Sequence, residues 1–192
     1  MRSLDPTEVS RDRSIPGLAD ALDARQAARW LEPHLAGIAG PGGRVRLVAA
    51  RPVRHKPGRR CLIEYELDVR PAGRVSRRVV VLGKTRARGV DYRTARLVEA
   101  LSAGGFPGTS EDGISVPEPL GVVPELGIWL QRKVPGVPAT RLLPGPEGPA
   151  LARRISAALH KLHSSGVPAR RSHRMEDEMR ILGLIMATAI LL

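Results

Sequence analysis

Near the middle of the chain, residues 77–89 have the sequence RRVVVLGKTRARG. Its three consecutive valines are typical of a short buried strand, because β-branched side chains pack well on a pleated sheet. This strand brings one lysine, Lys84, close to its end. An ammonium group placed there can neutralise phosphate oxygens, provided that a carboxylate holds it in position.

The segment that follows, DYRTARLVEALSAGG, predicts a helix over residues 91–103. Asp91 is a suitable N-cap, and two glycines at 104–105 end the pattern. Glu99 is the single acid in the interior of this helix.

The residues before Lys84 predict a helix and two more strands. Residues 18–35 have an amphipathic pattern, with Leu22, Ala28, Leu31 and Leu35 as expected core contacts. Residues 44–55 predict a strand with a bend at its proline, and CLIEYELDVR (61–70) alternates as a half-buried strand does. KPGRR (56–60) and PAGR (71–74) have turn composition. Three sequential antiparallel strands are the simplest interpretation.

After the helix at 91–103, the pattern predicts two short strands and then helices. The strands are PEPLGVV (117–123) and GIWLQRKV (127–134), and a segment dense in proline and glycine follows them. From Pro149 the apolar residues fall on one helical face, and a last helix is expected to begin near His173. The face consists of Leu151, Ile155, Ala158, Leu159 and Leu162. Strands separated from helices in this way predict an α+β fold with a five-stranded antiparallel sheet and one inserted helix.

Composition limits the partners. The 192 residues suit one domain, or one domain and part of another, and the net charge of +12 favours anionic partners. Aromatic residues make up only 3%, which leaves little to stack on bases, so no specific nucleic-acid partner is expected. The single cysteine, Cys61, excludes an internal disulfide and a cysteine-based zinc cluster.

The two ends of the sequence bear on location. The N-terminus has no apolar stretch of the kind found in secretory signals. The apolar segment ILGLIMATAILL (181–192) is shorter than the ~20 residues that span a bilayer. We therefore expect a cytoplasmic protein without a membrane span.

Four segments in this order resemble the N-terminal lobe of the aminoglycoside phosphotransferase family, a branch of the protein-kinase-like fold. They are KPGRRC (56–61), VVVLGK (79–84), VPEPLGVVPELGIWLQRKVPG (116–136) and ALHKLHSSGV (158–167). The resemblance covers roughly residues 40–180. It implies a kinase-like lobe at 40–134, a hinge and linker at 135–148, and part of a helical C-lobe at 149–192, which ends in the apolar tail; the helical segment at 1–39 precedes them.

The same resemblance implies roles for particular residues and ATP as the cofactor. Lys84 would contact the nucleotide phosphates, and Glu99 would pair with it. The KPGRR turn, with Lys56, Gly58 and Arg59, lies where the family has its phosphate-covering loop. The backbone from Arg132 to Val134 corresponds to the hinge that hydrogen-bonds adenine. Two departures are a cover loop with few glycines and Arg132 where the family has an acid.

A larger departure concerns catalysis. The family's catalytic loop has His-x-Asp followed by Asn, with a later Asp for magnesium, and this sequence has neither a His-x-Asp nor any asparagine. We therefore expect a truncated, catalytically incomplete chain. Mg²⁺ and a small-molecule hydroxyl substrate, such as an aminoglycoside or a sugar-like alcohol, would belong only to a complete relative.

Ordinary interpretations remain open beside these. Lys84 and Glu99 can be solvated surface residues, and KPGRR can be an exposed basic turn. His160 and His163 are spaced i, i+3 but have no third ligand, so no metal site is predicted. The alternative function is a non-catalytic basic module that binds anionic polymers or a membrane surface.

Overall fold

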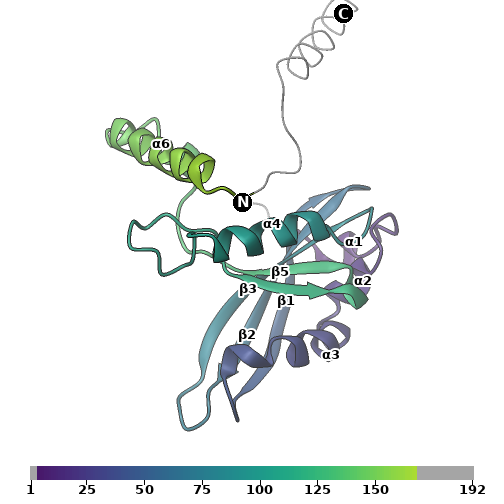
Figure 1. The fold of residues 1–192 in the computed structure, drawn as a ribbon. Coiled ribbons are helices and arrows are strands. Elements are labelled where there is room, and N and C mark those ends of the chain that lie inside the picture. The colour runs from purple at the N-terminus through teal and green to yellow at the C-terminus, as the bar shows by residue number, and fades with distance from the viewer. Residues whose placement is uncertain (1–3, 168–192) are drawn as a thin grey trace, which may run out of the picture.

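The computed structural model describes residues 4–167. The helix predicted near His173 and the apolar segment at 181–192 lie outside these residues. The described helices and strands follow one another from α1 near the N-terminus to α6 (Figure 1). In order they are α1 (Pro6–Val9), α2 (Leu18–Leu22), α3 (Ala24–His34), η1 (Ala36–Ala39), β1 (Arg44–Lys56), β2 (Arg60–Arg70), β3 (Arg77–Arg86), α4 (Tyr92–Ala103), β4 (Pro119–Val123), η2 (Pro124–Leu126), β5 (Ile128–Arg132), α5 (Ala139–Leu142) and α6 (Gly148–Ser164).

The strands form one antiparallel sheet in the order β1-β2-β3-β5-β4. This confirms the predicted α+β fold, with five antiparallel strands and a helix inserted after the third. The alternation in β2 has the predicted result, since its odd-numbered residues from Cys61 to Val69 are buried and the even-numbered ones between them are half-buried. The pairing of β1 with β2 shifts register between Pro52 and Arg54, where the bend was predicted.

The predicted helix at 18–35 is two helices in the structure. Asp23 lies between α2 and α3 with an extended backbone, and its Oδ1 accepts hydrogen bonds from the N–H groups of Arg25 and Gln26. The carboxylate therefore caps α3 and ends α2 at once. This break shifts the helical phase, so Ala27 is fully buried and Ala28, predicted as a core contact, is only half-buried.

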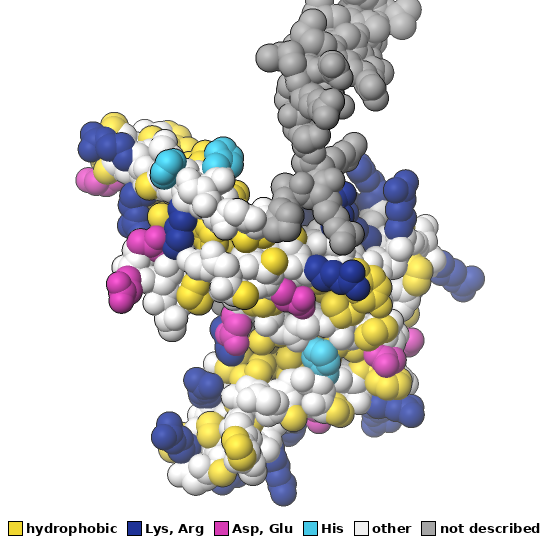
Figure 2. Space-filling view, in the orientation of Figure 1, with side chains coloured by type: hydrophobic (Ala, Val, Ile, Leu, Met, Phe, Trp, Pro, Cys, Tyr) yellow, Lys and Arg dark blue, Asp and Glu magenta, His cyan; other side chains and the backbone are white. Residues whose placement is uncertain are grey.

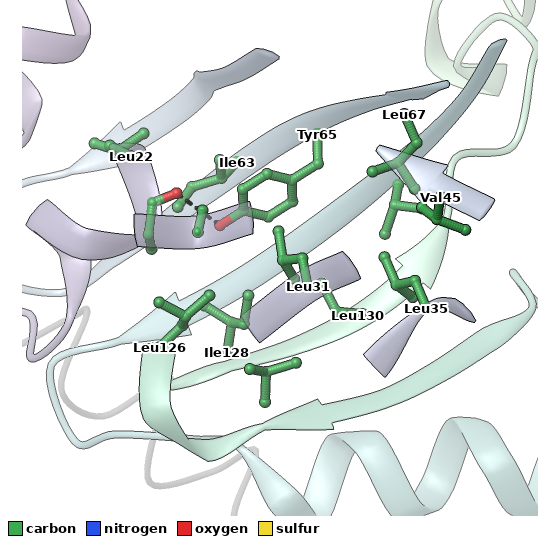
Figure 3. Packing of buried hydrophobic residues seen from close by; sticks show 14 of the residues in the cluster. Leu22, Leu31, Leu35, Val45, Ile63, Tyr65, Leu67, Leu126, Ile128 and Leu130 are labelled. Carbon is green, nitrogen blue, oxygen red and sulfur yellow. Dashed lines mark hydrogen bonds between the residues drawn. The ribbon is translucent and has the colours of Figure 1, made fainter. Parts of the chain in front are cut away.

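The core lies on one face of the sheet, under α2 and α3 (Figures 1 and 3). Tyr65 of β2 is completely buried there, and its hydroxyl donates to the carbonyl oxygen of Ala21 at 2.9 Å. That carbonyl belongs to the last turn of α2, where no further helical N–H is available to it. The hydrogen bond therefore joins the N-terminal helices to the centre of the sheet.

Among the described elements, α4 covers the other face of the sheet, and it begins, as predicted, with Asp91 capping the N–H of Thr94. Beyond β5, the proline- and glycine-rich segment contains the short helix α5, which its composition did not predict. Lys161 joins α6 to the loop after α4, since its Nζ forms an ion pair with Asp112 and donates to the carbonyl oxygen of Ile114. The lysine and serine contacts of Asp112 hold the pKa of that carboxyl well below its usual range.

The apolar face predicted on α6 is only partly covered in the described structure. Leu151 and Ile155 are half-buried, whereas Leu159 and Leu162 are 50% and 40% exposed. No described helix is both long enough and apolar enough to cross a membrane.

Replacing Tyr65 with phenylalanine tests the link between α2 and the sheet. We expect Tyr65→Phe to lower the free energy of unfolding by about 1–3 kcal/mol, because the buried Ala21 carbonyl loses its partner. Urea unfolding followed by circular dichroism measures this change. Tyr92→Phe, at the exposed start of α4, is the matched control and should change stability by less than ~0.5 kcal/mol. Equal stability of all three proteins would contradict the proposed role of the hydrogen bond.

Candidate anion-binding site

Four side chains form one row across the face of the sheet that α4 partly covers. Arg54 of β1 is paired with Leu62 of β2, Leu62 with Lys84 of β3, and Lys84 with Trp129 of β5. Directly paired residues on neighbouring strands point to the same face of a sheet. The pairing therefore places an arginine, a leucine, a lysine and a tryptophan side by side.

This row borders a hollow of about 240 Å³ between the sheet and the first turn of α4. We call it the basic hollow, because four of its lining residues are cations. The lining residues are Arg54, Arg60, Cys61, Leu62, Lys84, Thr85, Arg86, Thr94 and Trp129. Among the described residues, neither Arg54 nor Arg60 has an acidic partner within ion-pair distance.

Lys84 is held by β5 rather than by α4. Its Nζ donates a hydrogen bond of 2.7 Å to Oε1 of Gln131 and lies 4.3 Å from the centroid of the Trp129 ring. Both contacts stabilise an ammonium without neutralising it. Burial lowers the pKa of Lys84, and the positive charge of Arg86 lowers it further, while Asp91 acts in the opposite direction.

The predicted pair of Lys84 and Glu99 is not formed in the described structure. Glu99 is exposed on α4 and makes no ion pair with Lys84. The acid beside the hollow is Asp91, whose Oδ2 lies 2.8 Å from a guanidinium nitrogen of Arg86. The physical reason is the position on the helix, since Thr94 in the first turn lines the hollow and Glu99 lies more than one turn further along.

The KPGRR turn has a different role from the predicted phosphate cradle. The N–H of Gly58 donates to Oδ2 of Asp12 at 2.8 Å, and the same oxygen lies 2.8 Å from Nε2 of His55. The Gly58 N–H, which was predicted to bind phosphate, thus donates to a carboxylate of this chain instead. Arg59 is exposed and Lys56 half-buried, and the hollow is lined instead by Arg54, which precedes the turn, and by Arg60, the last residue of KPGRR.

The predicted hinge is partly available for hydrogen bonding. The N–H of Arg132 donates to the Glu118 carbonyl oxygen at 2.9 Å, and the Arg132 side chain forms an ion pair with the carboxylate of the same residue. Glu118 is therefore joined to Arg132 through both its backbone and its side chain. Val134 is 58% exposed, and within residues 4–167 its backbone N–H makes no hydrogen bond.

Sequence reasoning missed Arg54, Gln131 and Asp12, and it named the KPGRR turn without singling out its last residue, Arg60. Arg54 could have been found by extending the predicted hairpin register, because it faces Leu62, which in turn faces Lys84. Gln131 is two residues from Trp129, the direct partner of Lys84 on β5, and so shares its face. No local signal marks Asp12, which lies 46 residues before the glycine that it contacts.

The basic hollow has the chemistry of an anion site. It combines four cations with an apolar base from Leu62 and Trp129. No group of three or more His, Cys, Asp or Glu residues in the described structure can hold a metal ion. Searches with this chain matched no protein-family model, no curated protein and no solved structure.

The contact between Asp12 and the turn predicts a dependence of stability on pH. The Gly58 N–H and then His55 hold the pKa of Asp12 below its ordinary value of 3.8. A carboxyl whose pKa is depressed in the folded state stabilises the protein above its unfolded pKa, and this contribution is lost as the pH falls through the folded pKa. We expect Asp12→Asn to cost about 1–3 kcal/mol at pH 7, with the difference from wild type shrinking below about pH 4.

Urea unfolding of both proteins at pH 7, 5, 4 and 3 measures this dependence. Glu111→Gln removes an exposed acid of the loop after α4 and is the control, since it should follow the wild-type curve. A constant difference between Asp12→Asn and wild type at all four pH values would show that the carboxylate charge makes no contribution.

Proposed function

We propose that the sheet and α4 form the nucleotide-binding lobe of a small-molecule phosphotransferase, similar to the aminoglycoside phosphotransferases, with ATP as the ligand. The observation that carries the proposal is the place of Lys84. It lies on the third strand of a five-stranded antiparallel sheet, before the inserted helix, and its ammonium borders a hollow lined by three arginines. Lysine and arginine side chains converging on one hollow suit a chain of phosphate groups.

The size of the hollow decides which part of the nucleotide it would take. Pockets that bury a drug-sized ligand have volumes of about 300–1,000 Å³, so about 240 Å³ suits the phosphates better than a whole nucleotide. The nucleoside would then lie along the open face of the sheet, where Leu62 and Leu82 are half-buried. The backbone N–H of Val134, which makes no hydrogen bond in the described structure, is the group that we assign to adenine.

Binding and transfer are separate questions for this chain. Phosphoryl transfer depends on a base and on metal ligands, and the sequence has no His-x-Asp and no asparagine to provide them in the family's way. We therefore propose nucleotide binding without transfer.

Titration of the chain with ATP tests the proposal. With one lobe contacting the nucleotide, we expect a Kd of about 0.1–1 mM, equivalent to about 4–6 kcal/mol. Lys84→Met should weaken binding about tenfold or more, because one of the four cations of the hollow is lost. Changes in the NMR spectrum on titration measure both constants. Arg25→Met, which removes an exposed cation from α3 on the opposite face, should bind as wild type does. Equal ATP affinity of wild type and Lys84→Met would remove Lys84 from the site.

A second function is favoured by a separate observation, the arginines at the far end of the sheet. Six exposed arginines come together where β1 begins and where the β2–β3 hairpin turns, and Figure 2 shows basic side chains at that lower end. They are Arg44, Arg46, Arg70, Arg74, Arg77 and Arg78. Val75 at the tip of the hairpin is 90% exposed. An apolar tip surrounded by cations suits the headgroup region of an anionic membrane.

Binding to lipid vesicles tests this second function. Wild type should sediment with vesicles that contain phosphatidylserine and not with neutral ones, and binding should fall steeply as salt is raised. Replacing Arg70, Arg74 and Arg77 with serine should abolish the binding, whereas Lys84→Met should leave it unchanged. Equal binding of the triple variant would contradict a role for this end of the sheet. Retention by heparin without vesicle binding would assign the arginines to an anionic polymer instead.

A further inference from the structure

Gln131 is a polar side chain buried in β5 beside Lys84. Its exposed fraction is 7%, and its Oε1 accepts the hydrogen bond of 2.7 Å from Lys84 Nζ. A buried amide without a partner is costly, so this position favours glutamine only while a donor faces it. Lys84 is that donor. It lies on β3 and Gln131 lies on β5, and the two strands are paired at Lys84 and Trp129.

We infer that Gln131 is the residue that positions the Lys84 ammonium, and that its neutrality leaves the full charge of that ammonium available to an anionic ligand. The positioning of Lys84 by Gln131 stands independently of the ligand. Only the identity of that ligand as nucleotide phosphate rests on the proposed function.

A neutral partner differs from an acidic one in a way that matters for binding. A carboxylate at the same distance would fix the lysine equally well but would cancel most of its charge toward a phosphate. The amide oxygen orients the ammonium through a single hydrogen bond, and the face of the Trp129 ring provides a second contact without a net charge. The arrangement is suited to holding a cation in readiness for an anion.

The charged groups around Lys84 support this assignment. Those beside the hollow are Arg54 from β1, Arg60 from β2, Arg86 from β3 and Asp91 before α4, whereas the buried thiol of Cys61 belongs to the core on the opposite face. Burial raises the pKa of Cys61 to about 12, so the thiol is neutral at physiological pH. Asp91 is engaged by Arg86. Gln131 therefore fixes the ammonium by a hydrogen bond without adding a charge of its own.

The pKa of Lys84 provides a measurement that a purely structural role of Gln131 would not change. The chain has only four lysines, so their side-chain NMR signals can be assigned and titrated individually. The variants are Gln131→Glu, which adds a charge at the same place, and Gln131→Met, which removes the acceptor at similar volume. Gln26→Met, at an exposed position of α3, is the matched control.

We expect the Lys84 pKa to rise in the order Gln131→Met, wild type, Gln131→Glu, with at least about one unit between the outer two. The signals of the other three lysines and all values in Gln26→Met should stay in place. In wild type, a nuclear Overhauser effect should join the Lys84 side chain to that of Gln131. An unchanged Lys84 pKa in either folded variant, or the absence of this effect in wild type, would overturn the assignment.

Binding of inorganic pyrophosphate and of ATP completes the test. Gln131→Glu should weaken both about tenfold although it keeps Lys84 in place, because the added carboxylate competes with phosphate for the ammonium. If the pKa order holds but wild type binds pyrophosphate and not ATP, the positioning role of Gln131 stands and the proposed nucleotide function fails. If wild type binds ATP and both variants bind it equally well with an unchanged Lys84 pKa, the nucleotide function stands and the role of Gln131 fails.

Discussion

The contact of Tyr65 with Gly83 is the constraint on which the arrangement of the sheet depends. The Tyr65 ring lies so close to β3 that a Cβ built on Gly83 would be 2.6 Å from Cε2 of the ring, a separation that side chains do not tolerate. Position 83 therefore faces the core and must lack a side chain. Because side chains alternate along a strand, the same contact directs the next residue, Lys84, to the opposite face. Packing in the core thus sets the direction of the proposed ligand-binding lysine.

Because of this constraint, the two faces of the sheet have different roles. The N-terminal helices bury one face, and the hydroxyl of Tyr65 fastens them to the sheet through Ala21. The other face is free of that requirement, so β2 can place Glu64 and Glu66 there, where each pairs with a basic residue. A face that contributes little to the core can hold charged groups near water, and this is the condition that a binding site for an anion needs.

Local patterns predicted most of the fold, but contacts distant in sequence determine the candidate site. The alternation of β2, the valines of β3 and the cap at Asp91 were sufficient to predict these two strands and α4, but no local pattern placed β5 between β3 and β4. The break at Asp23 was missed because the apolar spacing continues across it. Gln131 lies 47 residues after Lys84 and Asp12 lies 46 before Gly58. Neither contact leaves a local signal, since each depends on which elements pack together and not on spacing within one of them.

The contact between Asp12 and Gly58 also explains why side chains, and not the turn backbone, form the candidate site. A glycine turn that cradles phosphate needs free N–H groups, and the Asp12 carboxylate already accepts the one from Gly58. His55, which shares this carboxylate, alternates in β1 with Arg54, so the two side chains point to opposite faces. The carboxylate therefore fixes the turn from the helix-covered side. Arg54, before the turn, and Arg60, its last residue, are left without acidic partners in the described structure and add positive charge to the basic hollow on the other side.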